Sequence, residues 1–287
     1  MSCRKCPMPI HRWTGVKLDH LDRYLQAYAT AAKSSLKRAY LDAFAGCGTC
    51  IFEDTGTVID GSALRALKAI PQFTEYHFVE IDRDKAAHLR EETTGRGNVR
   101  VYQGDCNLVV VEEVFKPGGM SQRAASFAFL DPPGLNLRWA TIEALARHRY
   151  DPKNRRKMEL LILYPFDMVV NLKLFRADVA DTLDSFFGTA TWRDILAESK
   201  ALAESLPQRR DRFVAFYVDR LKALGYSYVF PHGPVFDKSK PLYHIIFATD
   251  HPDGDKIMRK VWHRKKPPIL EDEMGYEAMR RPLLPPE

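Results

Sequence analysis

Residues 41–48 of this chain read Leu-Asp-Ala-Phe-Ala-Gly-Cys-Gly, and this stretch decides the fold. An apolar lead runs into the carboxylate of Asp42, and the two glycines Gly46 and Gly48 follow shortly after it. The pattern predicts a buried parallel strand that ends in a tight turn, where a ligand can approach the backbone. Phe44 lies within this turn, and we expect its ring to pack beside such a ligand.

Three segments further along the chain also end in carboxylates. They are predicted strands over residues 75–81, 99–103 and 125–130, and their ends carry Glu80 with Ile81 and Asp82, Asp105 with Cys106, and Asp131. The carboxyl ends of parallel strands meet at one edge of a sheet. Together with the first strand, predicted at 39–44, they therefore predict a nucleoside-binding site at that edge.

These four elements together resemble the class I S-adenosylmethionine-dependent methyltransferases. The stretches 13–18 and 21–25, the turn at 42–46 and the helix start Gly61-Ser62 narrow the resemblance to the three-Cys-motif partner proteins of bacteria. The resemblance implies an α/β fold with a doubly wound, Rossmann-like sheet of seven strands, of which the last pair is antiparallel. It also implies S-adenosylmethionine as the cofactor, and as a partner the cysteine-motif protein encoded beside members of that family.

The resemblance gives the first turn a role toward the methionine end of this cofactor. Asp42 would orient the ammonium group, while Gly46 and Gly48 would keep side chains out of the ligand's space. Phe44 would pack against the ligand. The alternative is an ordinary turn with left-handed glycines and an exposed aspartate.

The second and third strand ends would hold the nucleoside. Glu80 would accept hydrogen bonds from both ribose hydroxyls, as carboxylates do in dinucleotide sites, with Ile81 next to the adenine. A change of one residue in register would give the ribose to Asp82 instead. Asp105 would accept from the adenine amino group, assisted by the backbone N–H of Cys106. The alternative for Asp105 is a cap on the following helix.

The segment Asp131-Pro132-Pro133-Gly134 resembles the Asp/Asn-Pro-Pro-aromatic motif of methyltransferases that act on a nitrogen of a planar base. In that motif the carboxylate or amide and the carbonyl of the first proline accept hydrogen bonds from the target amine. Pro132 and Pro133 fix φ and so orient those groups. Gly134 stands where the motif has its aromatic residue, so stacking must come from elsewhere unless the segment is only a rigid end to the strand. The residues expected to supply it are Trp139, Tyr164 and Phe166.

The cysteines form two C-x-x-C pairs, Cys3 with Cys6 and Cys47 with Cys50. Such pairs can bind zinc, but Cys47 lies inside the predicted cofactor turn, where its thiolate would compete with the ligand. We therefore expect no metal site and interpret the five cysteines as reduced thiols of a cytoplasmic protein. No Pro-Cys motif supports Cys106 as a nucleophile.

Composition is that of an ordinary soluble globular protein, with 45% hydrophobic and 28% charged residues in 287. No apolar run is long enough to cross a membrane, and no secretory signal is expected. The net charge of +6 is concentrated in the basic segments 200–222 and 256–266. These segments suit the phosphate backbone of a nucleic acid, or alternatively form solvated helix faces.

The pattern along the chain divides it into an N-terminal arm (1–16), a methyltransferase core (17–166), an inserted helical region (167–205), the remainder of the core (206–252), and a basic helix with a Pro-rich tail (253–287). The predicted function is methyl transfer to a nitrogen of a nucleic-acid base. The alternatives are a non-catalytic scaffold for the cysteine-motif protein and a methyltransferase of a peptide or protein. A nicotinamide-dependent dehydrogenase fits the sequence poorly, because Ile51 replaces the last glycine of its fingerprint and Asp131-Pro132-Pro133 has no role in such an enzyme.

Local patterns also predict individual elements. Apolar residues at helical spacing predict a helix over 17–36, with Lys17 at its start. The N-terminal stretch that contains Lys17 is expected to fold over the mouth of the cofactor site. Residues 49–59 are expected as a loop, and 226–230 with 243–249 as the final antiparallel hairpin.

Overall fold

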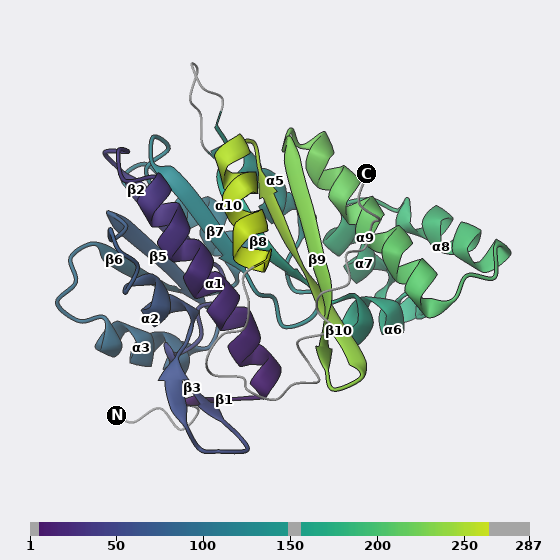
Figure 1. The fold of residues 1–287 in the computed structure, drawn as a ribbon, viewed down its shortest axis with the longest axis horizontal. Coiled ribbons are helices and arrows are strands. Elements are labelled where there is room, and N and C mark those ends of the chain that lie inside the picture. Colours follow the sequence, from purple (N-terminus) through teal and green to yellow (C-terminus); the bar gives the residue numbers. More distant parts are fainter. Residues whose placement is uncertain (1–5, 149–155, 264–287) are drawn as a thin grey trace.

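The computed structural model describes residues 6–148 and 156–263 (Figure 1). Its main sheet has seven strands in the order β6-β5-β2-β7-β8-β10-β9. In that order the strands are Val99–Gln103, Glu75–Glu80, Arg38–Asp42, Ala125–Leu130, Glu159–Tyr164, Lys240–Thr249 and Tyr228–Asp237. β10 is antiparallel to both of its neighbours, and the other neighbouring pairs are parallel. The predicted fold class, a doubly wound α/β sheet with an antiparallel last pair, is confirmed.

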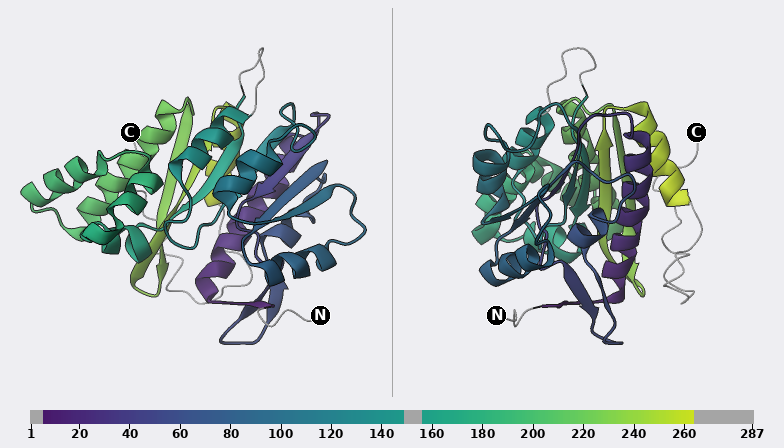
Figure 2. Two further views of the ribbon diagram at one scale, coloured as in Figure 1. Left: turned by 180° about the vertical axis from the view of Figure 1, so that it is seen from behind. Right: turned by 90° about the vertical axis from the view of Figure 1, so that its left-hand side faces the viewer.

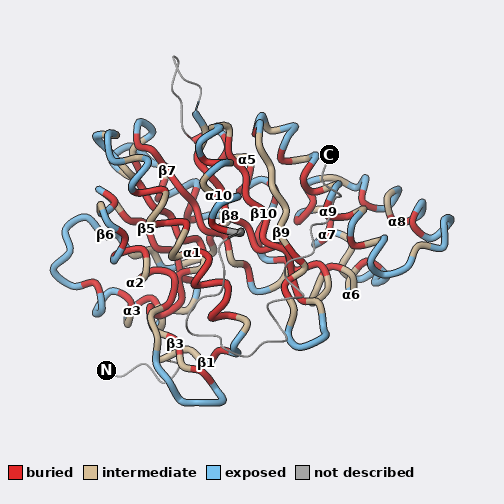
Figure 3. The backbone as a smooth tube through the Cα atoms, viewed as in Figure 1, coloured by how far each residue is buried: buried red, intermediate tan, exposed pale blue. Residues whose placement is uncertain are grey.

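The centre of the sheet consists of strands that are buried on both faces. Every residue of β7 and of β8 is buried, as their continuous apolar sequences require (Figure 3). From β2 the chain builds outward through β5 to β6, and it then returns to place β7 on the other side of β2. The order therefore reverses between β2 and β7, which is the switch point where ligands bind in open α/β sheets.

Helices cover both faces of the sheet. One face carries α1 (Arg12–Ala31), α2 (Ser62–Ala66), α3 (Arg83–Glu92) and α10 (Pro252–His263), whose apolar residues share one core cluster. The right-hand view of Figure 2 shows α1 and α10 together on this side. The other face carries α4 (Cys106–Val109), α5 (Trp139–His148), α7 (Ala180–Phe187), α8 (Trp192–Ala201) and α9 (Leu206–Ala223) around a second cluster.

The region between β8 and α9 is helical. Besides α7 and α8 it contains the short elements η2 (Phe166–Val170), α6 (Asn171–Lys173) and η3 (Ala177–Val179). A further short element, η1 (Val110–Val114), continues α4. The last two strands are longer than expected, with 10 residues each.

The N-terminal region differs most from the prediction. α1 begins at Arg12, so Lys17 lies within the helix and not at its start. The expected loop at 49–59 is instead a hairpin of β3 (Thr49–Phe52) and β4 (Val58–Asp60), and β1 (Met8–Ile10) pairs with β3 in a second sheet. Pro9 is tolerated because β1 is an edge strand. The pairing joins segments about forty residues apart, which periodicity within one segment cannot reveal.

Part of the predicted organisation lies outside the described residues. This applies to residues 1–5 of the arm, to the segment 149–155 and to the Pro-rich tail within 264–287. Among the helices that the structure describes, none has the length and apolarity needed to cross a membrane.

Candidate functional site

A cavity of about 1120 Å³ opens at the carboxyl ends of β2, β5, β6 and β7. Its wall is completed by the N-terminal segment and the start of α1, by the end of β8 together with η2 and α7, and by one residue of β10. Most of the predicted site residues lie in this wall, namely Phe44, Gly46, Glu80, Ile81, Asp105, Cys106, Asp131, Pro132 and Pro133. Asp42 and Gly48 are the two predicted residues that do not line it.

Glu80 is the last residue of β5, and its carboxylate is held by backbone donors. Oε2 accepts from the N–H of Gly46 at 2.8 Å, and Oε1 accepts from the N–H of Asp82 at 2.8 Å. Asp82 itself caps α3, because its side chain accepts from the N–H groups of Asp84 and Lys85. Glu80 therefore joins the first turn to the second strand end, while Asp82 starts a helix.

The two glycines of the first turn have different surroundings. Gly46 has a φ of 65°, and a Cβ added there would have only Met8 Cε nearby, at 3.9 Å. Gly48 has a φ of 91°, and a Cβ there would meet Leu89 Cδ1 at 3.0 Å and Leu64 Cγ at 3.3 Å. Gly46 thus keeps the cavity open, whereas Gly48 lets the turn pack against two leucines.

Asp42 lies in the interior beneath the turn. Its side chain is fully buried and accepts hydrogen bonds from the N–H of Phe44 at 3.2 Å and from the hydroxyl of Tyr40 at 3.4 Å. Burial raises the pKa of Asp42 to about 7, and the nearby charge of Asp131 acts in the same direction. The carboxylate therefore braces the backbone of the turn and does not reach the space where a cofactor ammonium was predicted.

Asp105 is both a helix cap and part of the cavity wall. Its Oδ1 accepts from the backbone N–H of Asn107 at 2.9 Å and from Asn107 Nδ2 at 2.8 Å. Asn107 Oδ1 in turn accepts from Arg138 N at 2.9 Å and Thr141 Oγ1 at 2.7 Å, so it ties the end of β6 to the start of α5. Burial raises the pKa of Cys106 to about 12, so this residue is a neutral thiol and not a nucleophilic thiolate.

Asp131, directly after β7, is paired with a residue of α1. Lys17 Nζ donates to Asp131 Oδ2, and the two side chains are 8% and 24% exposed. Lys17 Nζ also lies 5.8 Å from the ring centroid of Trp13, and this ring lies 5.7 Å from that of Tyr243 on β10. All four residues line the cavity. Sequence reasoning missed Tyr243, and its only local signal was an aromatic residue in a predicted strand.

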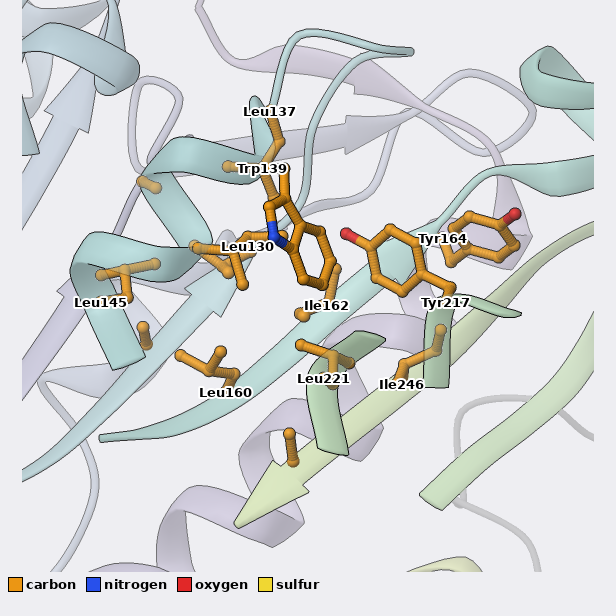
Figure 4. Close-up of a cluster of buried hydrophobic side chains, with 14 of the residues drawn as sticks. Leu130, Leu137, Trp139, Leu145, Leu160, Ile162, Tyr164, Tyr217, Leu221 and Ile246 are labelled. Carbon is orange, nitrogen blue, oxygen red and sulfur yellow. The ribbon is translucent and has the colours of Figure 1, made fainter. Parts of the chain in front are cut away.

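The expected sources of stacking are wrong. Trp139, Tyr164 and Phe166 are at most 2% exposed and belong to the core on the α5–α9 face, where Figure 4 shows Trp139 and Tyr164 among packed apolar side chains. Gly134 has a φ of 99°, and its N–H donates to the carbonyl of Pro132 at 2.9 Å. An aromatic residue would be strained in that conformation, which explains the glycine.

The basic segments do not form one face beside this cavity. Residues 200–222 lie in the α8–α9 layer and 256–263 in α10, on opposite faces of the sheet, and neither range lines the cavity; 264–266 fall outside the described residues. Their cations are largely paired: Arg210 binds Asp167 at 2.7 Å and Arg259 binds Asp255 at 2.9 Å. The cationic residues that do line the cavity are Lys17, Lys85 and Arg138.

No protein-family model and no curated protein sequence matches this chain. Among solved structures, TYW2 of M. jannaschii in complex with AdoMet is 8% identical over 83% of this chain and 75% of its own, with a TM-score of 0.40. Trm1 of Pyrococcus horikoshii with S-adenosyl-L-methionine is 10% identical over 86% and 58%, with a TM-score of 0.40. A Legionella pneumophila protein is 11% identical over 85% and 89%, with a TM-score of 0.48. All three scores are below 0.5, so the fold is assigned from the strand order of this chain itself.

Proposed function

We propose that the chain is an S-adenosylmethionine-dependent methyltransferase that acts on a nitrogen of a nucleic-acid base. The observation that carries this proposal is the cavity at the switch point, which Glu80, Asp105 and Asp131 enter from three different strand ends. Ligands of doubly wound sheets bind at this edge.

The cofactor side of the cavity fits a nucleoside that bears a methionine tail. Each oxygen of Glu80 accepts one backbone N–H and retains capacity for a second donor, so both ribose hydroxyls can bind there. Ile81 is 66% exposed and offers an apolar surface to a planar adenine. The position above Gly46 is open, as close approach of a ligand to the turn requires. S-adenosylmethionine supplies an electrophilic methyl group on a sulfonium.

The acceptor side would orient an amine-bearing ring. Lys17 engages Oδ2 of Asp131, so Oδ1 is left to accept a hydrogen bond from the acceptor nitrogen. The carbonyl of Pro132 has a second lone pair beyond its contact with Gly134. Trp13, whose ring packs against the buried Tyr243, provides an aromatic surface in the same wall. The chain would accelerate the reaction mainly by holding the nitrogen in line with the methyl group.

The partner is proposed to be the cysteine-motif protein of the three-Cys-motif partner family, and the compartment the cytoplasm. One observation favours a second function, a non-catalytic scaffold for that partner. The carboxylate of Asp131, which should orient the acceptor, is already paired with Lys17, and the two side chains are only 24% and 8% exposed. For catalysis, Oδ1 of Asp131 alone must orient the acceptor nitrogen, because Oδ2 is paired with Lys17.

Calorimetry with S-adenosylhomocysteine tests cofactor binding, and incubation with methyl-labelled cofactor and separate RNA, DNA and lysate-protein pools tests transfer. We expect binding and labelling of RNA or DNA. Binding without transfer to any pool, even with the partner protein present, would favour the scaffold. Labelling of protein alone would overturn the base acceptor, and absence of binding would overturn the cofactor.

A further inference from the structure

Three residues that are distant in the sequence bring metal-binding atoms together behind the first turn. Cys6 precedes β1, Cys47 lies in the turn after β2, and His88 is on α3. The two sulfur atoms and a ring nitrogen of His88 all lie within 4.8 Å of one another. We propose that Cys6, Cys47 and His88 bind one Zn²⁺ ion, which fastens the N-terminal segment to the cofactor turn.

The position of Cys47 removes the sequence-based objection to a metal site. Gly46 lines the cavity, but its neighbour Cys47 does not, and Cys47 is 1% exposed. Its sulfur lies 3.2 Å from the carbonyl oxygen of Thr49, on the side of the turn toward β3. A thiolate at Cys47 therefore would not compete with a ligand in the cavity, so the sequence-based reason against a metal at this turn does not apply.

His88 is already oriented against this turn. Its Nδ1 lies 3.0 Å from the carbonyl oxygen of Cys47, so a backbone contact fixes the imidazole plane. Metal-binding histidines commonly have one ring nitrogen engaged in this way by a backbone carbonyl. The side chain of His88 is 21% exposed, and an ion can reach it without opening the core.

The ligand set selects the metal. Two thiolates and an imidazole suit zinc and exclude the hard cations Mg²⁺ and Ca²⁺, which take oxygen ligands. Tetrahedral Zn–S and Zn–N bonds separate ligand atoms by roughly 3.5–3.8 Å. The ligand atoms now lie within 4.8 Å of one another, so binding needs only small movements, which the partly buried Cys6 and His88 can make toward the buried Cys47.

The C-x-x-C spacing pairs Cys47 with Cys50 as metal ligands, whereas the structure groups Cys47 with Cys6 and His88. Its C-x-x-C partner Cys50 lies on β3 and is not in the three-residue group. Cys50 is therefore the matched control for any test of the group.

The proposed ion would also shape the cavity. Met8, Pro9 and Ile10 form β1 and line the cavity, and they follow Cys6 closely in the chain. Met8 lies against the cofactor turn, since its Cε is the nearest atom to the Cβ position of Gly46. An ion at Cys6 would hold this strand against the turn, and so would fix one wall of the cavity.

The test uses the full-length protein purified under reducing conditions without added chelator. We expect one zinc per chain by mass spectrometry of the metal, and a thiolate-to-metal charge-transfer band after replacement by Co²⁺. Cys6→Ser, Cys47→Ser and His88→Gln should each weaken Zn²⁺ binding roughly tenfold or more, because each removes one ligand. Cys50→Ser should keep the band and the affinity.

Several results would overturn the site. They are wild-type protein that binds no Zn²⁺ or Co²⁺, loss of binding in Cys50→Ser equal to that in Cys47→Ser, or a Cys6–Cys47 disulfide in the reduced preparation. If Cys47→Ser does not fold, Cys6→Ser and His88→Gln decide the question, because both positions are partly exposed. Zinc should also slow hydrogen exchange over residues 6–16 in wild type and not in Cys6→Ser, independently of any enzymatic activity.

Discussion

The cavity has two halves that are built differently. The first half, at the ends of β2, β5 and β6, is held by backbone groups: Glu80 accepts N–H donors from Gly46 and Asp82. The second half, at the end of β7, is held by side chains, since Asp131 pairs with Lys17 of α1 and Trp13 contacts Tyr243 of β10. The backbone N–H groups of Gly46 and Asp82 can move only if the turn after β2 or the start of α3 moves with them, whereas a lysine side chain can change rotamer. The first half is suited to a constant ligand and the second to an exchangeable one.

The largest expected effect is on turnover, in the second half. Asp131→Ala should lower the rate of transfer by about 10²–10⁴, because it removes the hydrogen bond that orients the acceptor and any help with its proton. Asp131→Asn keeps an acceptor oxygen and should retain more activity if positioning dominates. Affinity for S-adenosylhomocysteine should change little in either variant. Near-wild-type turnover in Asp131→Ala would show that this half is structural.

The next effect concerns the stability of the fold and comes from Asp42, whose carboxyl group is buried beneath the first half of the cavity. The pKa of Asp42 is raised from 3.8 to about 7, so the native state holds its proton more tightly than the unfolded state does. Asp42 therefore adds stability that is complete below about pH 3.8 and is lost as the pH rises through about 7. The size is on the order of a few kcal/mol.

Urea unfolding of wild type and Asp42→Asn across this pH range measures that contribution. The free energy of unfolding of wild type, relative to the variant, should decrease as the pH rises. Tyr40→Phe removes one hydrogen bond to the carboxylate but keeps the titrating group, so it should retain the dependence. A difference that is constant with pH would contradict the assignment.

A smaller effect is expected on cofactor affinity, in the first half. Glu80→Ala removes hydrogen bonds to a charged group and should weaken S-adenosylhomocysteine binding by about 1.5–3 kcal/mol. The variant also frees the N–H of Gly46, so the turn itself should loosen. Asp82→Ala, which removes the side-chain cap of α3 but keeps the backbone N–H that donates to Glu80, is the comparison variant. If calorimetry finds that both variants lose the same affinity for S-adenosylhomocysteine, Glu80 has no specific role in cofactor binding.

The smallest effect sharpens the nucleic-acid proposal at the edge of the cavity. Arg138 is exposed in the cavity wall, whereas Arg259 is paired with Asp255 on α10. Arg138→Ala should reduce the slope of log affinity against log salt by roughly 1 if the residue contacts a phosphate, and Arg259→Ala should leave it unchanged. Filter binding over a salt series provides the slopes. Equal slopes in all three proteins would exclude Arg138 from the interface.

The sequence by itself determined the fold and the first half of the cavity. Buried parallel strands have largely apolar sequences. Glu80 is the last residue of β5, and Asp105 lies two residues after the end of β6, so each site residue can be located from the strand next to it in the chain. The strands predicted at 99–103 and 125–130 agree with β6 and β7. The segment Asp131-Pro132-Pro133-Gly134 was also identified from local sequence alone.

Only the tertiary structure decided the second half and the group behind the turn. Lys17 meets Asp131 across 114 residues, and Tyr243 contacts Trp13 across 230. Cys47 is close to Cys6 and His88, not only to its neighbour in the C-x-x-C spacing. A local sequence pattern indicates on which face of a helix or strand a side chain lies, but it does not indicate which distant segment packs against that face. The burial of Trp139 and the ion pairs of the basic segments arise from that packing, and for this reason they could not be read from the sequence.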